Sequence, residues 1–205
     1  MKYIFIAIFI IVNLNFNSKL FAQSYDLEII FVKMKCLKVV EAPFDTEEDI
    51  YGRIGLWAYK FLDDSNKPKY FGCCIDSKGS GTVKEYLNNS KYSLIKLGLN
   101  ESRTFNTSHI ITNLSYKNLT TLDFKIGGSL YDDDLITVSY QNCNECGDQS
   151  SRFVRMSAYK PQIDALTTAG SKYLKTGNDD ILELNYYEGD NLSSHIQCQF
   201  KLKVT

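Results

Sequence analysis

The sequence has few of the residues on which nucleophilic hydrolases depend. It contains two histidines, His109 and His195, in 205 residues, and it has no Gly-x-Ser-x-Gly motif. A serine or cysteine nucleophile needs a neighbouring base, which is most often histidine, and in the α/β-hydrolase fold the serine sits on that glycine-flanked turn. Nucleophilic hydrolysis is therefore poorly supported.

An excess of positive charge is also absent. Lys and Arg number 23 against 24 Asp and Glu, so the formal net charge is -1. Proteins that bind nucleic acid or anionic lipid surfaces carry a basic excess or a basic patch. We therefore expect neither nucleic acid nor an anionic membrane as the partner. Only three prolines occur and no linker composition is present, which favours one domain.

Beyond the first 22 residues, no apolar run is long enough to span a bilayer. At the start, Lys2 precedes an apolar segment at 3–12. The sequence Leu20-Phe21-Ala22 follows and ends in a small residue, as a signal-peptide cleavage site does. Three asparagines interrupt the apolar run, which is too short for a hydrocarbon core of about 30 Å. We predict a signal peptide at 1–22 and a single domain at 23–205, secreted, periplasmic or on the cell surface. The absence of cysteine near the cleavage site argues against a lipoprotein.

The stretch from Ile50 to Phe61 contains the only tryptophan and has the pattern of a central strand. Aromatic and β-branched residues favour a strand, while Gly52 and Gly55 would weaken a helix. Alternation assigns Ile50, Ile54, Leu56 and Ala58 to one face and Tyr51, Arg53, Trp57, Tyr59 and Phe61 to the other. We expect a second sheet to cover one of these faces.

Two further strands are predicted near the ends of the mature chain. In Leu27–Val40, the residues Ile30, Val32, Met34 and Cys36 alternate with Phe31, Lys33 and Lys35, and the lysines should face solvent. In Ser194–Val204, apolar residues alternate with polar ones without a break from Ile196 onward. Such a strand covers a core with one face and meets water with the other.

The rest of the pattern adds shorter strands. They are predicted at Tyr70–Ile75, Tyr92–Leu97, around Ile110-Ile111, and at Leu122–Ile126, Leu135–Tyr140, Phe153–Tyr159 and Ile181–Tyr187. Gly127-Gly128 should end the strand at Leu122–Ile126. One helix is predicted at Gln162–Leu174. Roughly eight to ten strands with at most one short helix indicate an all-β fold, an antiparallel β-sandwich. A closed β-barrel is the alternative.

Six cysteines in an exported chain make disulfides the first expectation. Cys36 and Cys198 fall on the inward faces of the terminal strands, where they form either a buried bridge or two buried thiols. The pair Cys73-Cys74 could cross-link to Cys143 or Cys146. A redox role for Cys143-x-x-Cys146 or a four-thiolate zinc site is less favoured, because the loop lacks a helix setting and the compartment is oxidising.

Acidic clusters stand directly before three predicted strands. We predict calcium ligands among these residues: Glu48, Asp49, Asp132, Asp133, Asp134, Asp179 and Asp180. Calcium takes six to eight oxygen ligands, which carboxylates from several loops at one end of a sandwich would supply. The alternative is that these acids only mark turns and protect strand edges. No EF-hand spacing is present.

The first functional hypothesis is a secreted binding or interaction module without catalysis, with a protein or a carbohydrate as ligand. Tyrosines that could stack on a sugar or peptide, or instead complete the core edge, are Tyr131, Tyr140, Tyr159, Tyr173, Tyr186 and Tyr187. The second hypothesis is a carboxylate-dependent hydrolase of the glycosidase type. The third, a membrane-active protein, rests on Glu101–Thr121, where Ile110-Ile111 breaks the required alternation.

Overall fold

The computed structural model describes residues 23–39, 46–72, 82–132, 151–166, 170–187 and 194–205. Sheet A consists of β1 (Ser24–Lys38), β6 (Ser102–Ser115), β9 (Lys172–Tyr173), β10 (Leu182–Tyr187) and β11 (His195–Val204). Sheet B consists of β2 (Glu47–Leu62), β3 (Pro68–Gly72), β4 (Lys84–Asn89), β5 (Ile95–Gly98), β7 (Asp123–Asp132) and β8 (Ser151–Arg155). The described helical segments are α2 (Tyr116–Thr120), the 3₁₀ helix η2 (Met156–Tyr159) and α3 (Lys160–Asp164).

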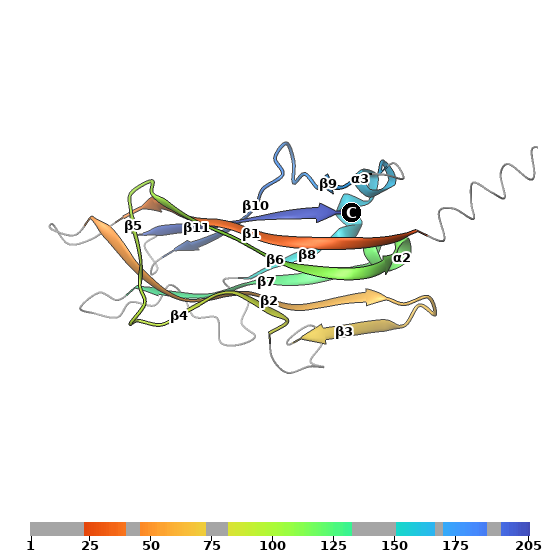
Figure 1. The fold of residues 1–205 in the computed structure, drawn as a ribbon, viewed down its shortest axis with the longest axis horizontal. Coiled ribbons are helices and arrows are strands. Elements are labelled where there is room, and N and C mark those ends of the chain that lie inside the picture. Colours follow the sequence, from red (N-terminus) through yellow and green to blue (C-terminus); the bar gives the residue numbers. More distant parts are fainter. Residues whose placement is uncertain (1–22, 40–45, 73–81, 133–150, 167–169, 188–193) are drawn as a thin grey trace, which may run out of the picture.

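The two sheets are stacked face to face, which confirms the predicted β-sandwich (Figure 1). In sheet A the strand order is β10-β11-β1-β6, and β9 also pairs with β11. In sheet B the order is β3-β2-β7-β8, and β4 and β5 also pair with β2. All pairings are antiparallel, and the described strands form two separate sheets instead of the closed barrel.

The predicted central strand is confirmed as β2. Along one side it pairs with β7, and along the other it pairs in turn with β5, β4 and β3. Ile50, Ile54 and Leu56 are fully buried on the face that sheet A covers. Burial of such side chains stabilises the fold by about 1.5 to 3 kcal/mol each.

A β-bulge in β2 changes the predicted face of its last residues. Leu56 lies opposite Ile126, whereas Tyr59 lies opposite the fully buried Phe124, so one extra residue is accommodated between them. Directly opposite residues point to the same face of a sheet. The assignment of Tyr59 and Phe61 to the face opposite Ile54 and Leu56 is therefore wrong. Both pack against the core from its margin and stack with Phe71.

Trp57 lies at this bulge. Its indole Nε1 donates a hydrogen bond of 2.8 Å to the carbonyl oxygen of Gly127 on β7. The bulge thus directs the single tryptophan toward the backbone of the partner strand.

A second bulge, in β1, changes which residues of this strand face the core. Leu27, Ile29 and Phe31 face the core, and the register shift between Phe31 and Lys33 then returns Met34 and Cys36 to the core. The predicted faces are therefore correct for Met34 and Cys36 inside and for Lys33 and Lys35 outside, and the placement of Phe31 on the lysine face is wrong. Two residues predicted to be on the inner face, Ile30 and Val32, are half-buried and line a concavity on the outer face of sheet A.

Some predicted boundaries are also wrong. β7 continues through Gly127-Gly128 to Asp132. The helix predicted at Gln162–Leu174 is reduced to α3, and Lys172–Tyr173 is instead a strand paired with Lys203 and Val204. The apolar residues at helical spacing do not extend the helix to Leu174, because residues 172–173 pair with the otherwise free edge of β11. The strand predicted at Leu135–Tyr140 lies outside the described residues.

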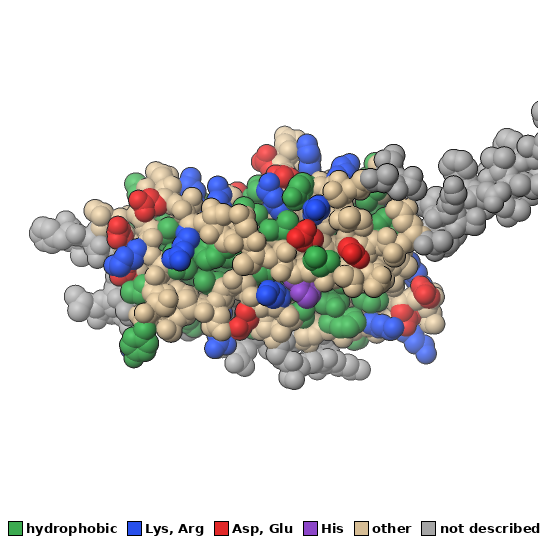
Figure 2. Space-filling model, viewed as in Figure 1, with side chains coloured by type: hydrophobic (Ala, Val, Ile, Leu, Met, Phe, Trp, Pro, Cys, Tyr) green, Lys and Arg blue, Asp and Glu red, His purple; other side chains and the backbone are tan. Residues whose placement is uncertain are grey.

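The core fills the space between the sheets and includes the fully buried Phe31, Phe124 and Phe200. The Phe31 and Phe200 ring centroids are 5.0 Å apart, and the buried Tyr86 hydroxyl donates to the Ile29 carbonyl at 3.2 Å. Outside, charges of both signs are interspersed over the face seen in Figure 2, with hydrophobic side chains showing between the layers. Among the described helices, none has the length and apolar composition of a membrane span.

Cys36 and Cys198 are both fully buried, as the alternation of β1 and β11 predicted. Cys198 lies opposite Met34 and Cys36 lies opposite Ile196, so the two cysteines are diagonal neighbours on adjacent strands. They are present as thiols and not as a bridge. Burial raises the pKa of the Cys198 thiol, which keeps it protonated and unreactive. The other four cysteines lie outside the described residues.

Gly128→Ala should destabilise the fold strongly. A Cβ at Gly128 would lie 1.7 Å from the carbonyl oxygen of Arg53, so the β2 and β7 backbones would have to separate. We expect the free energy of unfolding to fall by at least about 2 kcal/mol and the melting temperature to fall by roughly 4 to 8 °C. Gly170→Ala is the control, because a Cβ there meets nothing within 4 Å. Equal melting temperatures for the two variants would contradict this packing.

Stability should also fall on mild acidification. Desolvation lowers the pKa of His109 and of His195 below the ordinary value of 6.5, with repulsion from Lys84 adding to the effect at His109. The unfolded chain therefore binds protons at a higher pH than the folded chain does. The free energy of unfolding should drop as pH falls through about 6.5. In chemical denaturation at several pH values, the double variant His109→Gln, His195→Gln should show a smaller drop; an unchanged drop would contradict the assignment.

Candidate functional site

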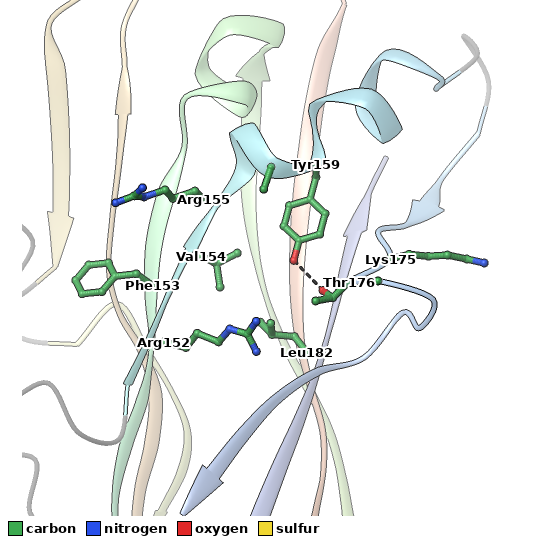
Figure 3. A pocket seen from close by; sticks show the side chains of 10 residues that line it. Arg152, Phe153, Val154, Arg155, Tyr159, Lys175, Thr176 and Leu182 are labelled. Carbon is green, nitrogen blue, oxygen red and sulfur yellow. Dashed lines mark hydrogen bonds between the residues drawn. The ribbon is translucent and has the colours of Figure 1, made fainter.

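A cleft lies between the edge strands β8 of sheet B and β10 of sheet A, beside η2 (Figure 3). Its volume is about 550 Å³, which is within the range of small-molecule sites. The described residues that line it are Arg152, Phe153, Val154, Arg155, Ala158, Tyr159, Lys175, Thr176, Gly177 and Leu182.

The apolar floor of the cleft follows from strand alternation. Val154 lies opposite the core residue Phe124, so it points inward, and Leu182 is buried at the start of β10. The next residue toward the N-terminus, Phe153, lies opposite Lys125 on the outer face and remains 50% exposed. The cleft therefore has an apolar base and an aromatic ring at its margin.

Arg152 connects the two sheet edges across the cleft. It shares the inward side of β8 with Val154, and its Nη1 donates to the carbonyl oxygen of Glu183 on β10 at 3.1 Å. The guanidinium has five N–H donors, so this bond leaves several for a ligand. Figure 3 shows the group extending toward Leu182, below Tyr159 and Thr176.

The wall formed by 175–177 is held in place by hydrogen bonds. The Gln162 side chain both donates to the Lys175 carbonyl and accepts from the Lys175 amide, each at 2.8 Å. The hydroxyls of Tyr159 and Thr176 lie 2.8 Å apart, and the Thr176 amide donates to the Asp179 carbonyl at 2.7 Å. Because side-chain and backbone groups are both fixed, this wall is formed before any ligand arrives.

The cleft is cationic. Arg152, Arg155 and Lys175 are all exposed, and no carboxylate is present among the described lining residues. Arg155 and Lys175 extend away from the cleft on opposite sides, whereas Arg152 shares the central space with the Tyr159–Thr176 hydroxyl pair (Figure 3). This arrangement fits the anionic group of a ligand placed at Arg152, with Arg155 and Lys175 as more distant positive charges.

The predicted calcium ligands on β2 and β7 lie at one end of sheet B. Glu48 is fully buried opposite Leu97, and Asp49 forms an ion pair of 3.0 Å with Lys96 of β5. Asp132 ends β7 opposite Ile50. Asp133 and Asp134 lie outside the described residues.

The remaining predicted ligands, Asp179 and Asp180, lie in the turn that precedes β10 of sheet A. Asp180 forms an ion pair of 3.0 Å with Lys201, and Asp179 closes the turn with Thr176. The structure therefore does not bring them to Glu48 and Asp49. Within the described ranges, no three His, Cys, Asp or Glu side chains are gathered for a metal.

The tyrosines predicted as possible ligand contacts lie partly in the core and partly on the surface. Tyr159 and Tyr186 are buried, and Tyr131 stacks on Tyr51 with ring centroids 5.2 Å apart. Tyr173 and Tyr187 remain exposed. Tyr140 lies outside the described residues.

Of the residues that line the cleft, sequence reasoning singled out Tyr159 alone. Arg152 and Lys175 are distant in sequence, and nothing in the local pattern shows that they share a cleft. The one local signal is that Arg152 and Arg155 flank the apolar pair Phe153-Val154 in a short edge strand. An edge strand carries such charges readily.

Comparison with known proteins leaves the function open. Neither the protein-family models nor the curated proteins include a match to this sequence.

Calcium binding stays a prediction that rests on Asp132–Asp134. If these residues complete a site with Glu48 or Asp49, millimolar calcium should raise the melting temperature relative to chelator. A ligand at a hundred times its Kd stabilises the folded state by about 2.7 kcal/mol. The variant Asp133→Asn, Asp134→Asn should remove the shift. An equal melting temperature with calcium and with chelator would show that these acids bind no calcium and only mark the end of a strand.

Proposed function

We propose that this chain is an exported, non-catalytic binding module, and that the cleft between β8 and β10 binds an anionic group of its ligand. The observation that carries this proposal is the composition of the cleft. Three cations and no carboxylate are found among the described residues that line a preformed cleft of about 550 Å³.

The central group for recognition is the guanidinium of Arg152. A planar guanidinium pairs with a carboxylate, sulfate or phosphate through two parallel hydrogen bonds, a geometry that lysine does not offer. The hydroxyls of Tyr159 and Thr176 are next to the same space and can donate to a further oxygen. Val154 and Leu182 provide apolar contact beneath.

Binding is favoured over hydrolysis by the chemistry of the same residues. A glycosidase needs two carboxyl groups on either side of the scissile bond. The described lining residues include no Asp, Glu, His or Cys to act as acid, base or nucleophile. They can hold an anion through positive charge and N–H donors.

Export is part of the proposal and rests on the sequence at 1–22. The ligand is then an extracellular or periplasmic anion, carried either by a saccharide or by a protein surface. Both sources present the same group to Arg152, so the experiment has an arm for each.

Titration of the mature protein with trigalacturonate and with a hexaglutamate peptide should show saturable binding of at least one. Arg152→Gln should remove most of it, and Arg152→Lys should restore only part because lysine lacks the paired donors. Lys175→Gln and Arg155→Gln should each weaken binding about 1.4- to fivefold, since exposed ion pairs contribute about 0.2 to 1 kcal/mol. Isothermal titration at low and high salt measures these effects.

Lys91→Gln serves as the matched control, because it removes an exposed cation from the segment between β4 and β5. Since Arg152 also joins the two sheets, its variants are first checked by thermal melting. Binding that Arg152→Gln leaves intact in a folded protein would overturn the proposed site, and so would no binding in either arm.

A further inference from the structure

A second concavity lies on the outer face of sheet A, with a volume of about 430 Å³. The described residues that line it are Glu28, Ile30, Val32, Asn106, Ser108, Tyr173, Lys201 and Lys203. They come from four neighbouring strands, β9, β11, β1 and β6. Three inter-strand spacings make this groove roughly 14 Å across.

The apolar floor of the groove results from the bulge in β1. Without the register shift after Phe31, Ile30 and Val32 would share the inner face with Met34 and Cys36. The bulge places them instead on the outer face, half-buried, with Ile30 directly between Lys201 and Ser108. Partly exposed aliphatic side chains in a concavity on the outer face of a sheet offer an apolar contact surface.

Tyr173 stands at one end of this floor. Its ring is 44% exposed, and the Lys201 Nζ lies 5.3 Å from the ring centroid, which holds the ring in position. An exposed tyrosine ring offers a flat apolar surface together with a polar hydroxyl.

The charges of the groove are compensated locally. Lys201 pairs with Asp180 at 3.0 Å, and Lys203 pairs with Glu28 at 3.8 Å. The groove therefore differs from the cationic cleft between β8 and β10, because it has no excess of positive charge to attract a phosphate or a sulfate. The paired ions still offer hydrogen-bond donors and acceptors at its edge.

Neutral polar groups stand at the opposite end. Asn106 has a positive φ of 51° within the edge strand β6, and Ser108 lies opposite Ile30. An amide and a hydroxyl each both donate and accept hydrogen bonds. Sugar hydroxyls have the same dual character.

We propose that this groove binds a neutral saccharide. The apolar face of a pyranose ring packs on Tyr173 and on the aliphatic floor, and its hydroxyls bond to Asn106, Ser108 and the ion pairs. The proposal is independent of the anion site, although the segment 172–176 contributes to both.

The test is isothermal titration of the mature protein with a panel of neutral tetrasaccharides, namely cellotetraose, mannotetraose and chitotetraose. At least one should bind. Tyr173→Ala should weaken that binding about tenfold, as expected for the loss of one ring contact of about 1.4 kcal/mol. Tyr173→Phe should keep most of the affinity, because the ring remains.

Tyr92→Ala is the control, since Tyr92 is 88% exposed and outside the groove. Arg152→Gln should leave neutral saccharide binding unchanged, and Tyr173→Ala should leave trigalacturonate binding unchanged, so the two proposals fail separately. The groove proposal is overturned if no member of the panel binds, or if Tyr173→Ala binds as well as the wild type.

Discussion

The close approach of the β2 and β7 backbones is the contact on which the rest of the sandwich depends. A Cβ at Gly128 would lie 1.7 Å from the Arg53 oxygen, and one at Gly52 would lie 2.1 Å from the Ser129 oxygen. Only glycine permits this spacing. Because β2 also pairs with β3, β4 and β5, the position of every described strand of sheet B except β8 is set directly by β2 or by its contact with β7.

Both candidate sites arise where regular pairing stops or shifts. β9 and β10 follow each other along the same side of β11, and the turn between them forms one wall of the cleft. The cleft exists because the edges of β8 and β10 face each other without strand pairing, and the Arg152–Glu183 hydrogen bond joins them. The groove exists because one bulge places Ile30 and Val32 outside. Irregularities in the strands, more than the strands themselves, provide the binding surfaces.

This distinction also explains how much the sequence could predict. Unbroken alternation placed β11 correctly, and composition identified β2, because both signals are local. Bulges depend on the partner strand, so the faces of Tyr59 and Ile30 could not be read from alternation alone. The cleft could not be predicted, because Arg152 and Lys175 meet only through the sheet topology. The acidic clusters show the converse: Glu48 and Asp180 each stand beside an apolar strand in the sequence, but Glu48 lies in β2 of sheet B and Asp180 in the turn before β10 of sheet A.

The β2–β7 pair is the rigid centre of sheet B, and the cleft wall at 175–177 is already formed without ligand. Amide hydrogen exchange of the ligand-free protein tests both features most directly. We expect the slowest exchange in β2 and β7, and measurable protection at Lys175 and Thr176, whose amides are hydrogen-bonded to Gln162 and Asp179. Rapid exchange throughout β2 would contradict the organising role of this pair, and unprotected amides at Lys175 and Thr176 would show that the cleft is not preformed.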